Sequence, residues 1–345
     1  MNQEILINTV KRLVKEPKGI LAADESAPTC DARFEKLGIP KTEENRRAYR
    51  ELLITAPGLE NYISGIILFD ETIRQSTSDG QSFVSVMQSK GIEVGIKVDA
   101  GLADFPEHLG EKITKGLDGL DARLKEYKKL GATFAKWRAV YKIEENTPSE
   151  DCMKENAKIF AKYAKLCQEN DIVPIVEPEV LIDGDHGIEK CFKVTARNLE
   201  VVFAELEKAL VFLPGMILKT SMVLPGVDSK IAVHGSEIAQ YTIKCLKEKV
   251  PEAIGGIVFL SGGQPDEFAT ENLNAMHQLG PLPWPLTFSY SRAIQNPVLK
   301  AWAFNPSDVT HAQNLLLKTA EKNSLASMGV YKGDKILPDR PKDVI

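Results

Sequence analysis

The chain has 345 residues, of which 43% are hydrophobic and 26% charged, a composition that excludes a largely disordered protein and predicts a sizeable core. Its 43 Lys and Arg against 48 Asp and Glu give a formal net charge of −5, so we expect no nucleic-acid partner. The five cysteines are scattered without a CxxC pair, which indicates neither a disulfide framework nor a thiolate metal site and fits a reducing cytosol.

The first element in chain order is an amphipathic helix at the N-terminus. The apolar residues Ile5, Leu6, Val10, Leu13 and Val14 alternate there with charged ones, and the segment lacks the apolar core of a signal peptide. No stretch of the chain approaches 18 consecutive apolar residues. We therefore expect a cytoplasmic protein with no membrane partner.

Eight short runs rich in Ile, Val, Ala and Phe come next, each with the length of a buried strand. They are GILAAD (19–24), ISGIILF (63–69), EVGIKVD (93–99), FAKWRAV (134–140), IVPIVEPEV (172–180), MILKTSMV (216–223), AIGGIVFLSG (253–262) and PLTFSYSR (285–292). Amphipathic stretches of helical period separate most of them, at residues 42–56, 120–130, 150–168 and 196–210.

This alternation predicts parallel strands joined by right-handed helical crossovers, and eight strands predict a closed (β/α)8 TIM barrel. A doubly wound open sheet is the alternative. The barrel is favoured because no GxGxxG follows the first strand and because polar residues gather late in almost every strand, where barrel active sites lie. Residues 1–328 then form one barrel domain, and the charged residues 329–345 form a short C-terminal tail.

Charged residues on the predicted strands share faces at a spacing of two, and the barrel would bring them to one mouth. Six of them come from five strands: Asp24, Lys97, Lys136, Glu177, Glu179 and Lys219. A structural ion-pair network is one explanation. We favour a functional site, because a merely structural layer in a barrel is usually built from Val, Ile and Leu.

A lysine that is partly desolvated among other cations is more readily present as a neutral amine, and neutral amines attack carbonyls. Lys219 lies in the most apolar of the runs and is a candidate Schiff-base nucleophile. Glu177 or Glu179 would move protons during loss of water from the carbinolamine. The spacing alone leaves open which of the three lysines is the nucleophile.

Two anion sites are also predicted. Ser261, Gly262 and Gly263 close the seventh strand, where backbone N–H groups would cradle a phosphate together with Arg292 after the eighth strand. Arg33 and Arg138 are candidates for a second anion.

Metal chemistry has little support in the sequence. The five histidines lie far apart without HExxH or HxH spacing, and the loop at residues 183–186 is better explained as a cap than as a cation site. We expect no metal and no cofactor.

Several longer segments resemble one family in order and spacing. They are KGILAADES (18–26), TEENRRAYRELL (42–53), GIKVDAG (95–101), GLDGLDARLKEYKKLGATFAKWRAV (116–140), VPIVEPEVLIDGDHGIEKC (173–191), FLSGGQ (259–264) and LTFSYSRAIQNPVLKAW (286–302). From about residue 10 to residue 328 the chain resembles the class I, metal-independent fructose-bisphosphate aldolases. The resemblance implies a (β/α)8 fold and reversible cleavage of fructose 1,6-bisphosphate to dihydroxyacetone phosphate and glyceraldehyde 3-phosphate, in glycolysis and gluconeogenesis.

The resemblance also implies roles for individual residues. Lys219 matches the Schiff-base lysine, Glu177 the proton shuttle and Asp24 the base at the cleaved bond. Glu179 and Lys136 match assisting groups. The substrate-binding matches are Ser261, Gly262, Gly263, Ser289 and Arg292 for one phosphate, and Arg33, Lys97 and Arg138 for the other end of the sugar.

The sequence departs from the family at a few positions. Thr220 and Ser221 follow the lysine where vertebrate enzymes have proline and asparagine, Ala32 replaces a lysine, and Ser291 replaces a glycine that contributes backbone to phosphate. The alternatives are another Schiff-base barrel lyase, such as a transaldolase or sugar-acid aldolase, and a non-catalytic interaction role. The family also suggests a homo-oligomer, a tetramer.

Overall fold

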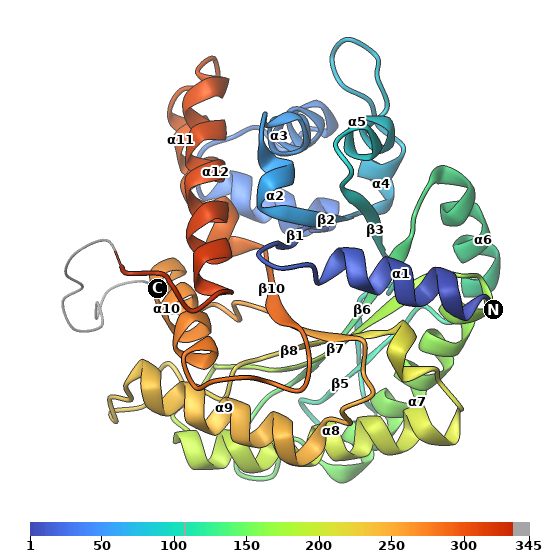
Figure 1. Cartoon of the computed structure of the whole chain (residues 1–345), viewed down its shortest axis with the longest axis vertical. Helices are drawn as coiled ribbons and strands as arrows, with labels where there is room; N and C mark the ends of the chain where they lie inside the picture. Colours follow the sequence, from blue (N-terminus) through green and yellow to red (C-terminus); the bar gives the residue numbers. More distant parts are fainter. Residues whose placement is uncertain (107, 334–345) are drawn as a thin grey trace.

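The eight apolar runs form a closed barrel of parallel strands in the computed structural model, which describes residues 1–106 and 108–333 (Figure 1). The strands are β1 (Gly19–Ala23), β2 (Ile63–Leu68), β3 (Glu93–Lys97), β6 (Phe134–Tyr141), β7 (Val173–Val180), β8 (Ile217–Thr220), β9 (Gly256–Phe259) and β10 (Leu286–Tyr290). The last strand pairs with the first, with Ile20 opposite Ser289. The predicted barrel is thereby confirmed, and the open-sheet alternative is wrong.

Six of the eight strands end one to three residues sooner than predicted, and in most of them polar residues follow close behind the last paired residue. Asp24 and Asp99 follow the last residues of β1 and β3, and the apolar runs around β8 and β9 likewise continue past the paired residues. These polar residues therefore lie on the rim at the C-terminal mouth, where side chains are free to turn inward.

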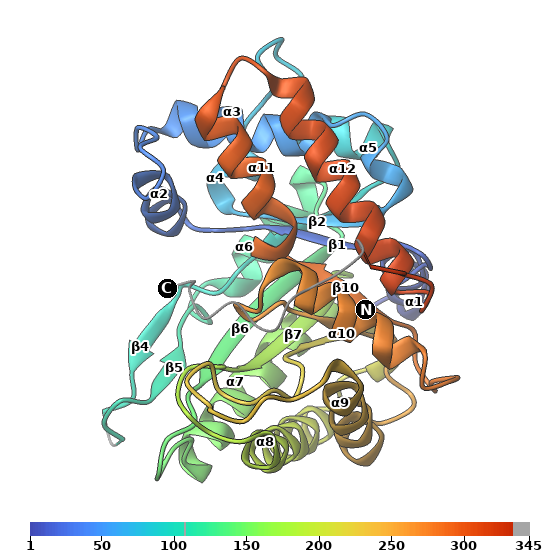
Figure 2. The same cartoon turned by 90° about the vertical axis from the view of Figure 1, so that its left-hand side faces the viewer.

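Helices surround the barrel on the outside (Figures 1 and 2). They are α1 (Gln3–Leu13), α2 (Ala27–Glu35), α3 (Glu43–Thr55), α4 (Asp70–Ile73), α5 (Phe83–Ser89), α6 (Leu120–Leu130), α7 (Glu150–Glu169), α8 (Ile188–Lys208), α9 (Gly235–Lys249), α10 (Asp266–His277), α11 (Arg292–Phe304) and α12 (Val309–Ala326). Short 3₁₀ turns occur at Leu59–Asn61 and Leu213–Gly215. The helix predicted at 196–210 begins earlier, at Ile188, because apolar residues from Ile188 onward are buried against the barrel.

The N-terminal helix closes the bottom of the barrel. Leu6, Val10 and Leu13 of α1 are buried in one apolar cluster with Ile20 and Ile217 from the strands. Because this end is filled with hydrocarbon, the charged residues of the interior are confined to the C-terminal mouth. The predicted amphipathic helix is thereby confirmed, and its apolar face covers the bottom of the barrel.

A two-stranded antiparallel hairpin, β4 (Leu102–Asp104) and β5 (Lys112–Thr114), projects from the barrel between β3 and α6 (Figure 2). The sequence did not predict it, since three-residue strands carry too short a pattern. Asn156 of α7 fixes it: its side chain accepts from Thr114 N at 3.2 Å and donates to Lys112 O at 3.0 Å.

Most of the predicted tail, residues 329–345, lies outside the described residues. In its described part the backbone N–H of Tyr331 donates to Asn274 of α10 at 2.9 Å, and the Tyr331 ring is buried. The division into a barrel of residues 1–328 and a tail stays a prediction. Among the residues that the structure describes, no helix is long and apolar enough to cross a membrane.

Candidate active site

Four charged side chains meet inside the C-terminal mouth of the barrel. Lys136 Nζ lies 2.7 Å from Asp24 Oδ2 and 3.2 Å from Glu177 Oε2. Lys219 Nζ lies 3.0 Å from the other oxygen of Glu177, Oε1. All four side chains are buried. Burial of four charges is costly unless they pair, and the pairs here satisfy that requirement.

Barrel closure is what brings these residues together. Lys136, Glu177 and Lys219 lie on the consecutive neighbours β6, β7 and β8, with Arg138 opposite Glu177 in the register. Asp24 follows β1, which is not adjacent to β6 in the sheet. The ion pair between Lys136 and Asp24 therefore crosses the interior of the barrel.

Each partner shifts the protonation of the others. Burial by itself would raise the pKa of Asp24, but Lys136 and Lys219 outweigh burial and lower the pKa to about 2. Burial likewise opposes ionisation of Glu177, and the same two lysines lower its pKa. Burial would lower the pKa of Lys136, yet Asp24 and Glu177 raise it well above the usual value. At neutral pH both carboxylates are ionised and Lys136 is an ammonium.

Two further ion pairs surround this cluster. Lys97 Nζ lies 2.5 Å from Asp99 Oδ1, and Arg138 Nε lies 2.5 Å from Glu179 Oε2. The spacing of residues on the strands left open whether Glu177 or Glu179 moves protons at the lysine, and the resemblance implied Glu177. The structure brings Glu177 to Lys219 and pairs Glu179 with Arg138.

The residues of the predicted phosphate cradle also meet at the mouth, beyond β9 and β10. Gly262 and Gly263 have φ of +58° and +86°, conformations that glycine adopts without strain. A Cβ on Gly263 would lie 3.4 Å from the guanidinium of Arg292, the first residue of α11. The hydroxyl of Ser289 is buried without a hydrogen-bond partner among the described residues. Backbone donors, an arginine and a free hydroxyl make this a suitable site for an anion.

Arg33, on α2, belongs to a network that the sequence did not reveal. It forms an ion pair with Glu25 and donates to Gln295 Oε1 at 3.3 Å and to Asn296 Oδ1 at 3.4 Å. Glu25 also accepts from Arg50 at 2.8 Å. The one signal in the sequence was the position of Glu25 directly after Asp24 at the end of a buried strand.

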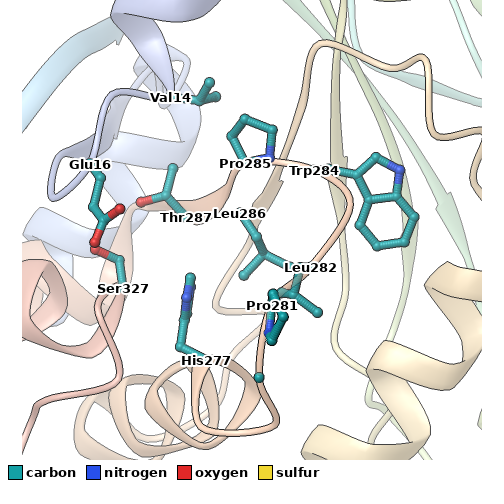
Figure 3. A pocket seen from close by; sticks show the side chains of 11 residues that line it. Val14, Glu16, His277, Pro281, Leu282, Trp284, Pro285, Leu286, Thr287 and Ser327 are labelled. Carbon is teal, nitrogen blue, oxygen red and sulfur yellow. The ribbon is translucent and has the colours of Figure 1, made fainter.

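A separate cavity of about 520 Å³ lies at the opposite end of the barrel (Figure 3). It is lined by Val14 and Glu16, which precede β1, by His277, Trp284 and other residues before and in β10, and by Ser327 after α12. Figure 3 shows mainly apolar and proline side chains, with Glu16 as the charged group among those that line it. This cavity holds no lysine and is not the site described above.

No group of three or more His, Cys, Asp or Glu in the described part of the chain could hold a metal ion. In the loop at residues 183–186, both ring nitrogens of His186 are buried without a hydrogen-bond partner in the part of the chain that the structure describes. The five cysteines, all within the described residues, are free and buried.

Comparison with known proteins identifies the family. The family model for class I fructose-bisphosphate aldolases matches residues 5–342. The chain belongs to the class I fructose-bisphosphate aldolases. A probable class 1 fructose-bisphosphate aldolase of Xanthomonas campestris is 52% identical over 334 residues, covering 96% of this chain and all of the relative. The cytosolic fructose-bisphosphate aldolase 4 of Arabidopsis thaliana is 52% identical over 318 residues, covering 92% of this chain and 81% of the relative.

A solved aldolase structure agrees with the fold. The fructose-bisphosphate aldolase of Plasmodium falciparum, in complex with TRAP and a small-molecule inhibitor, superposes with a TM-score of 0.94 at 46% identity, covering 96% of each chain. As a class I fructose-bisphosphate aldolase, the chain is a carbon–carbon lyase that reversibly cleaves fructose 1,6-bisphosphate in glycolysis and gluconeogenesis. Class I aldolases act through a lysine Schiff base and without a metal.

Proposed function

We propose that Lys219 is the nucleophile of this aldolase and that the charged cluster around it carries the proton transfers. The supporting observation is the contrast between the lysines. Lys136 is held as an ammonium by two carboxylates, and Lys97 is paired with Asp99, whereas Lys219 contacts one oxygen of Glu177. Glu177 contacts both Lys136 and Lys219, but Lys136 is also paired with Asp24, so Lys219 is the lysine that Glu177 can deprotonate more readily.

The reaction begins with attack of the Lys219 amine on the C2 carbonyl of the sugar, which gives a carbinolamine. Glu177, which has taken a proton from Lys219, gives that proton to the carbinolamine hydroxyl; the hydroxyl leaves as water, and a protonated imine remains. Glu177 is placed for this transfer because Oε1 faces Lys219 at 3.0 Å, while Oε2 is paired with the Lys136 ammonium at 3.2 Å. Oε1 is therefore the oxygen of Glu177 that exchanges a proton with Lys219 and with the carbinolamine.

Cleavage follows when Asp24 takes the proton of the C4 hydroxyl. The C3–C4 bond breaks, its electron pair moves into the protonated imine, and a neutral enamine forms. Asp24 is ionised at neutral pH and is therefore able to accept this proton. Glyceraldehyde 3-phosphate leaves, the enamine is protonated at C3, and hydrolysis releases dihydroxyacetone phosphate. Lys136 and Glu179 assist as fixed charges beside these groups.

The two phosphates of the substrate fit the two ends of the mouth. The cradle of Ser261, Gly262, Gly263, Ser289 and Arg292 follows β9 and β10, close to Lys219 on β8 in the barrel order. It therefore suits the C1 phosphate, which is adjacent to the imine carbon. The resemblance assigns Arg33 of α2, Lys97 of β3 and Arg138 of β6 to the C6 phosphate end.

Borohydride trapping tests the proposal. The protein is incubated with dihydroxyacetone phosphate and borohydride in EDTA, and the adduct is located by intact and peptide mass spectrometry. We expect one reduced adduct, on Lys219, and none in a Lys219→Ala variant. No adduct, or an adduct on Lys97 or Lys136, would contradict the assignment.

Two finer expectations accompany the proposal. We expect a cytoplasmic enzyme, supported by relatives whose names include "cytosolic", and a homo-oligomer, a tetramer, as the resemblance implies. Fractionation of the source cell and light scattering of the purified protein test these points. A transaldolase or sugar-acid aldolase activity would show as faster turnover of a monophosphate than of fructose 1,6-bisphosphate. A non-catalytic role would show as full biological activity of Lys219→Ala.

A further inference from the structure

The hydroxyl of Ser291 lies between two groups that hold Arg33. Ser291 Oγ is 3.0 Å from Glu25 Oε1 and 3.1 Å from Gln295 Nε2. This serine stands at a position where the resembling family has glycine, so its side chain adds a contact that a glycine does not make.

The direction of both hydrogen bonds follows from proton counting. The Gln295 amide donates to Ala22 O at 2.6 Å and to Ser291 Oγ at 3.1 Å, which uses its two hydrogens. Ser291 therefore accepts from Gln295, and its own proton is donated to the Glu25 carboxylate. One hydroxyl thus connects an amide and a carboxylate in a fixed order.

Arg33 depends on both of these groups. Its guanidinium pairs with Glu25 and donates to Gln295 Oε1 at 3.3 Å. Gln295 is itself fixed by the hydroxyl of Tyr49, which donates to the same Oε1 at 3.0 Å. Burial by itself would raise the pKa of Glu25, but Arg50 contributes to lowering it. The carboxylate therefore stays ionised and remains paired with Arg33.

We propose that Ser291 is a positioning residue that sets the orientation of Arg33 for the C6 phosphate of fructose 1,6-bisphosphate. The inference rests on the proposed function, which assigns Arg33 to that end of the sugar. Without the hydroxyl, Gln295 Nε2 loses one acceptor and Glu25 Oε1 loses one donor, in a partly buried setting where such losses are costly. Gln295 and Glu25 are then less well fixed, and the guanidinium of Arg33 that they hold is less well oriented toward the C6 phosphate.

The consequence is specific for one half of the substrate. Dihydroxyacetone phosphate carries the phosphate next to the imine carbon and has no distal phosphate, so it does not need Arg33. A change at Ser291 should therefore weaken the binding of fructose 1,6-bisphosphate and leave the binding of dihydroxyacetone phosphate unchanged. General damage to the mouth would weaken the binding of both compounds.

The test uses Ser291→Ala and Ser291→Gly in the full-length enzyme, with Ser307→Ala, an exposed serine after α11, as the matched control. KM and kcat are measured for fructose 1,6-bisphosphate, together with the inhibition constant of dihydroxyacetone phosphate. We expect KM to rise about fivefold in both Ser291 variants, the loss typical of one hydrogen bond near a charge. The inhibition constant and kcat should stay within about twofold of the original enzyme.

Three results would overturn the proposal: an unchanged KM, an equal rise of KM and of the inhibition constant, or a rise in Ser291→Gly alone, which would assign the effect to the backbone. Failure of the proposed function looks different. In that case the unmodified enzyme forms no borohydride adduct on Lys219, whatever the Ser291 variants do.

Discussion

Lys219 and Glu177 face each other across neighbouring strands, with Nζ of the lysine 3.0 Å from Oε1 of the glutamate and both side chains buried. In the proposed mechanism the lysine attacks as a neutral amine, and the ionised carboxylate takes its proton. The same carboxylate contacts Lys136 through its other oxygen at 3.2 Å. Glu177 is thus the link between the nucleophile and the rest of the charged cluster.

Replacing Glu177 by glutamine should lower kcat by about 10²- to 10⁴-fold, because the amide has nearly the same shape but cannot carry the proton. The rate of borohydride trapping on Lys219 should fall as well. Glu237→Gln, on the exposed face of α9, is the matched control and should leave both rates unchanged. Steady-state kinetics and timed trapping check the prediction, and a kcat for Glu177→Gln equal to that of the control would refute the shuttle role.

Replacing Asp24 by asparagine should destabilise the protein at pH 7 by about 2 kcal/mol, since the folded-state pKa of about 2 lies below the usual 3.8. A lowered carboxyl pKa stabilises the fold above pH 3.8, and this stabilisation is lost as the pH falls toward 2. The difference in Tm between the two proteins should therefore shrink between pH 5 and about pH 3. A difference that is constant over this range would show that the charge of Asp24 is not what stabilises the site.

Replacing Asp266 by asparagine should act in the opposite direction. Burial raises the pKa of Asp266 to about 6, against the opposing pull of Lys300 and Asn296. Its contribution to stability is complete below pH 3.8 and is lost as the pH rises through about 6. Asp266→Asn should be more stable than the original protein at pH 8, by about 1 kcal/mol after allowance for solvent screening, and equal to it near pH 4. Melting curves at both pH values check this, and equal Tm values at pH 8 would contradict it.

Replacing Gly263 by alanine should raise KM for fructose 1,6-bisphosphate about tenfold, because alanine is strained at a φ of +86° and the backbone shift that relieves the strain would move the cradle N–H groups. Gly80→Ala is the control. Gly80 has nearly the same φ, +89° against +86°, but its Cβ would meet nothing within 4 Å. Both variants should lose similar stability, and only Gly263→Ala should lose affinity. An equal KM in the two variants would remove Gly263 from the phosphate site.

The sequence predicted the architecture because its evidence is local. Eight apolar runs alternate with amphipathic stretches, and each strand or helix can be recognised from its own period. It did not predict the hairpin of β4 and β5, whose strands have three residues each. Nor did it predict the network in which Arg33 and Arg50 pair with Glu25 and Arg33 donates to Gln295, because these three partners come from three different helices.

The family and its reaction were thus determined by the sequence alone, through motifs in a fixed order and the position of charges at the ends of predicted strands. Which of these charged residues pair with one another was decided only by the tertiary structure. The residues alone left three lysines and two glutamates open, since all five lie on predicted strands. Closure of the barrel places Lys136 against Asp24 and Glu177 and leaves Lys219 with Glu177. Protonation depends on distances of a few ångströms between residues far apart in the chain, and those distances exist only when β1 and β10 have joined.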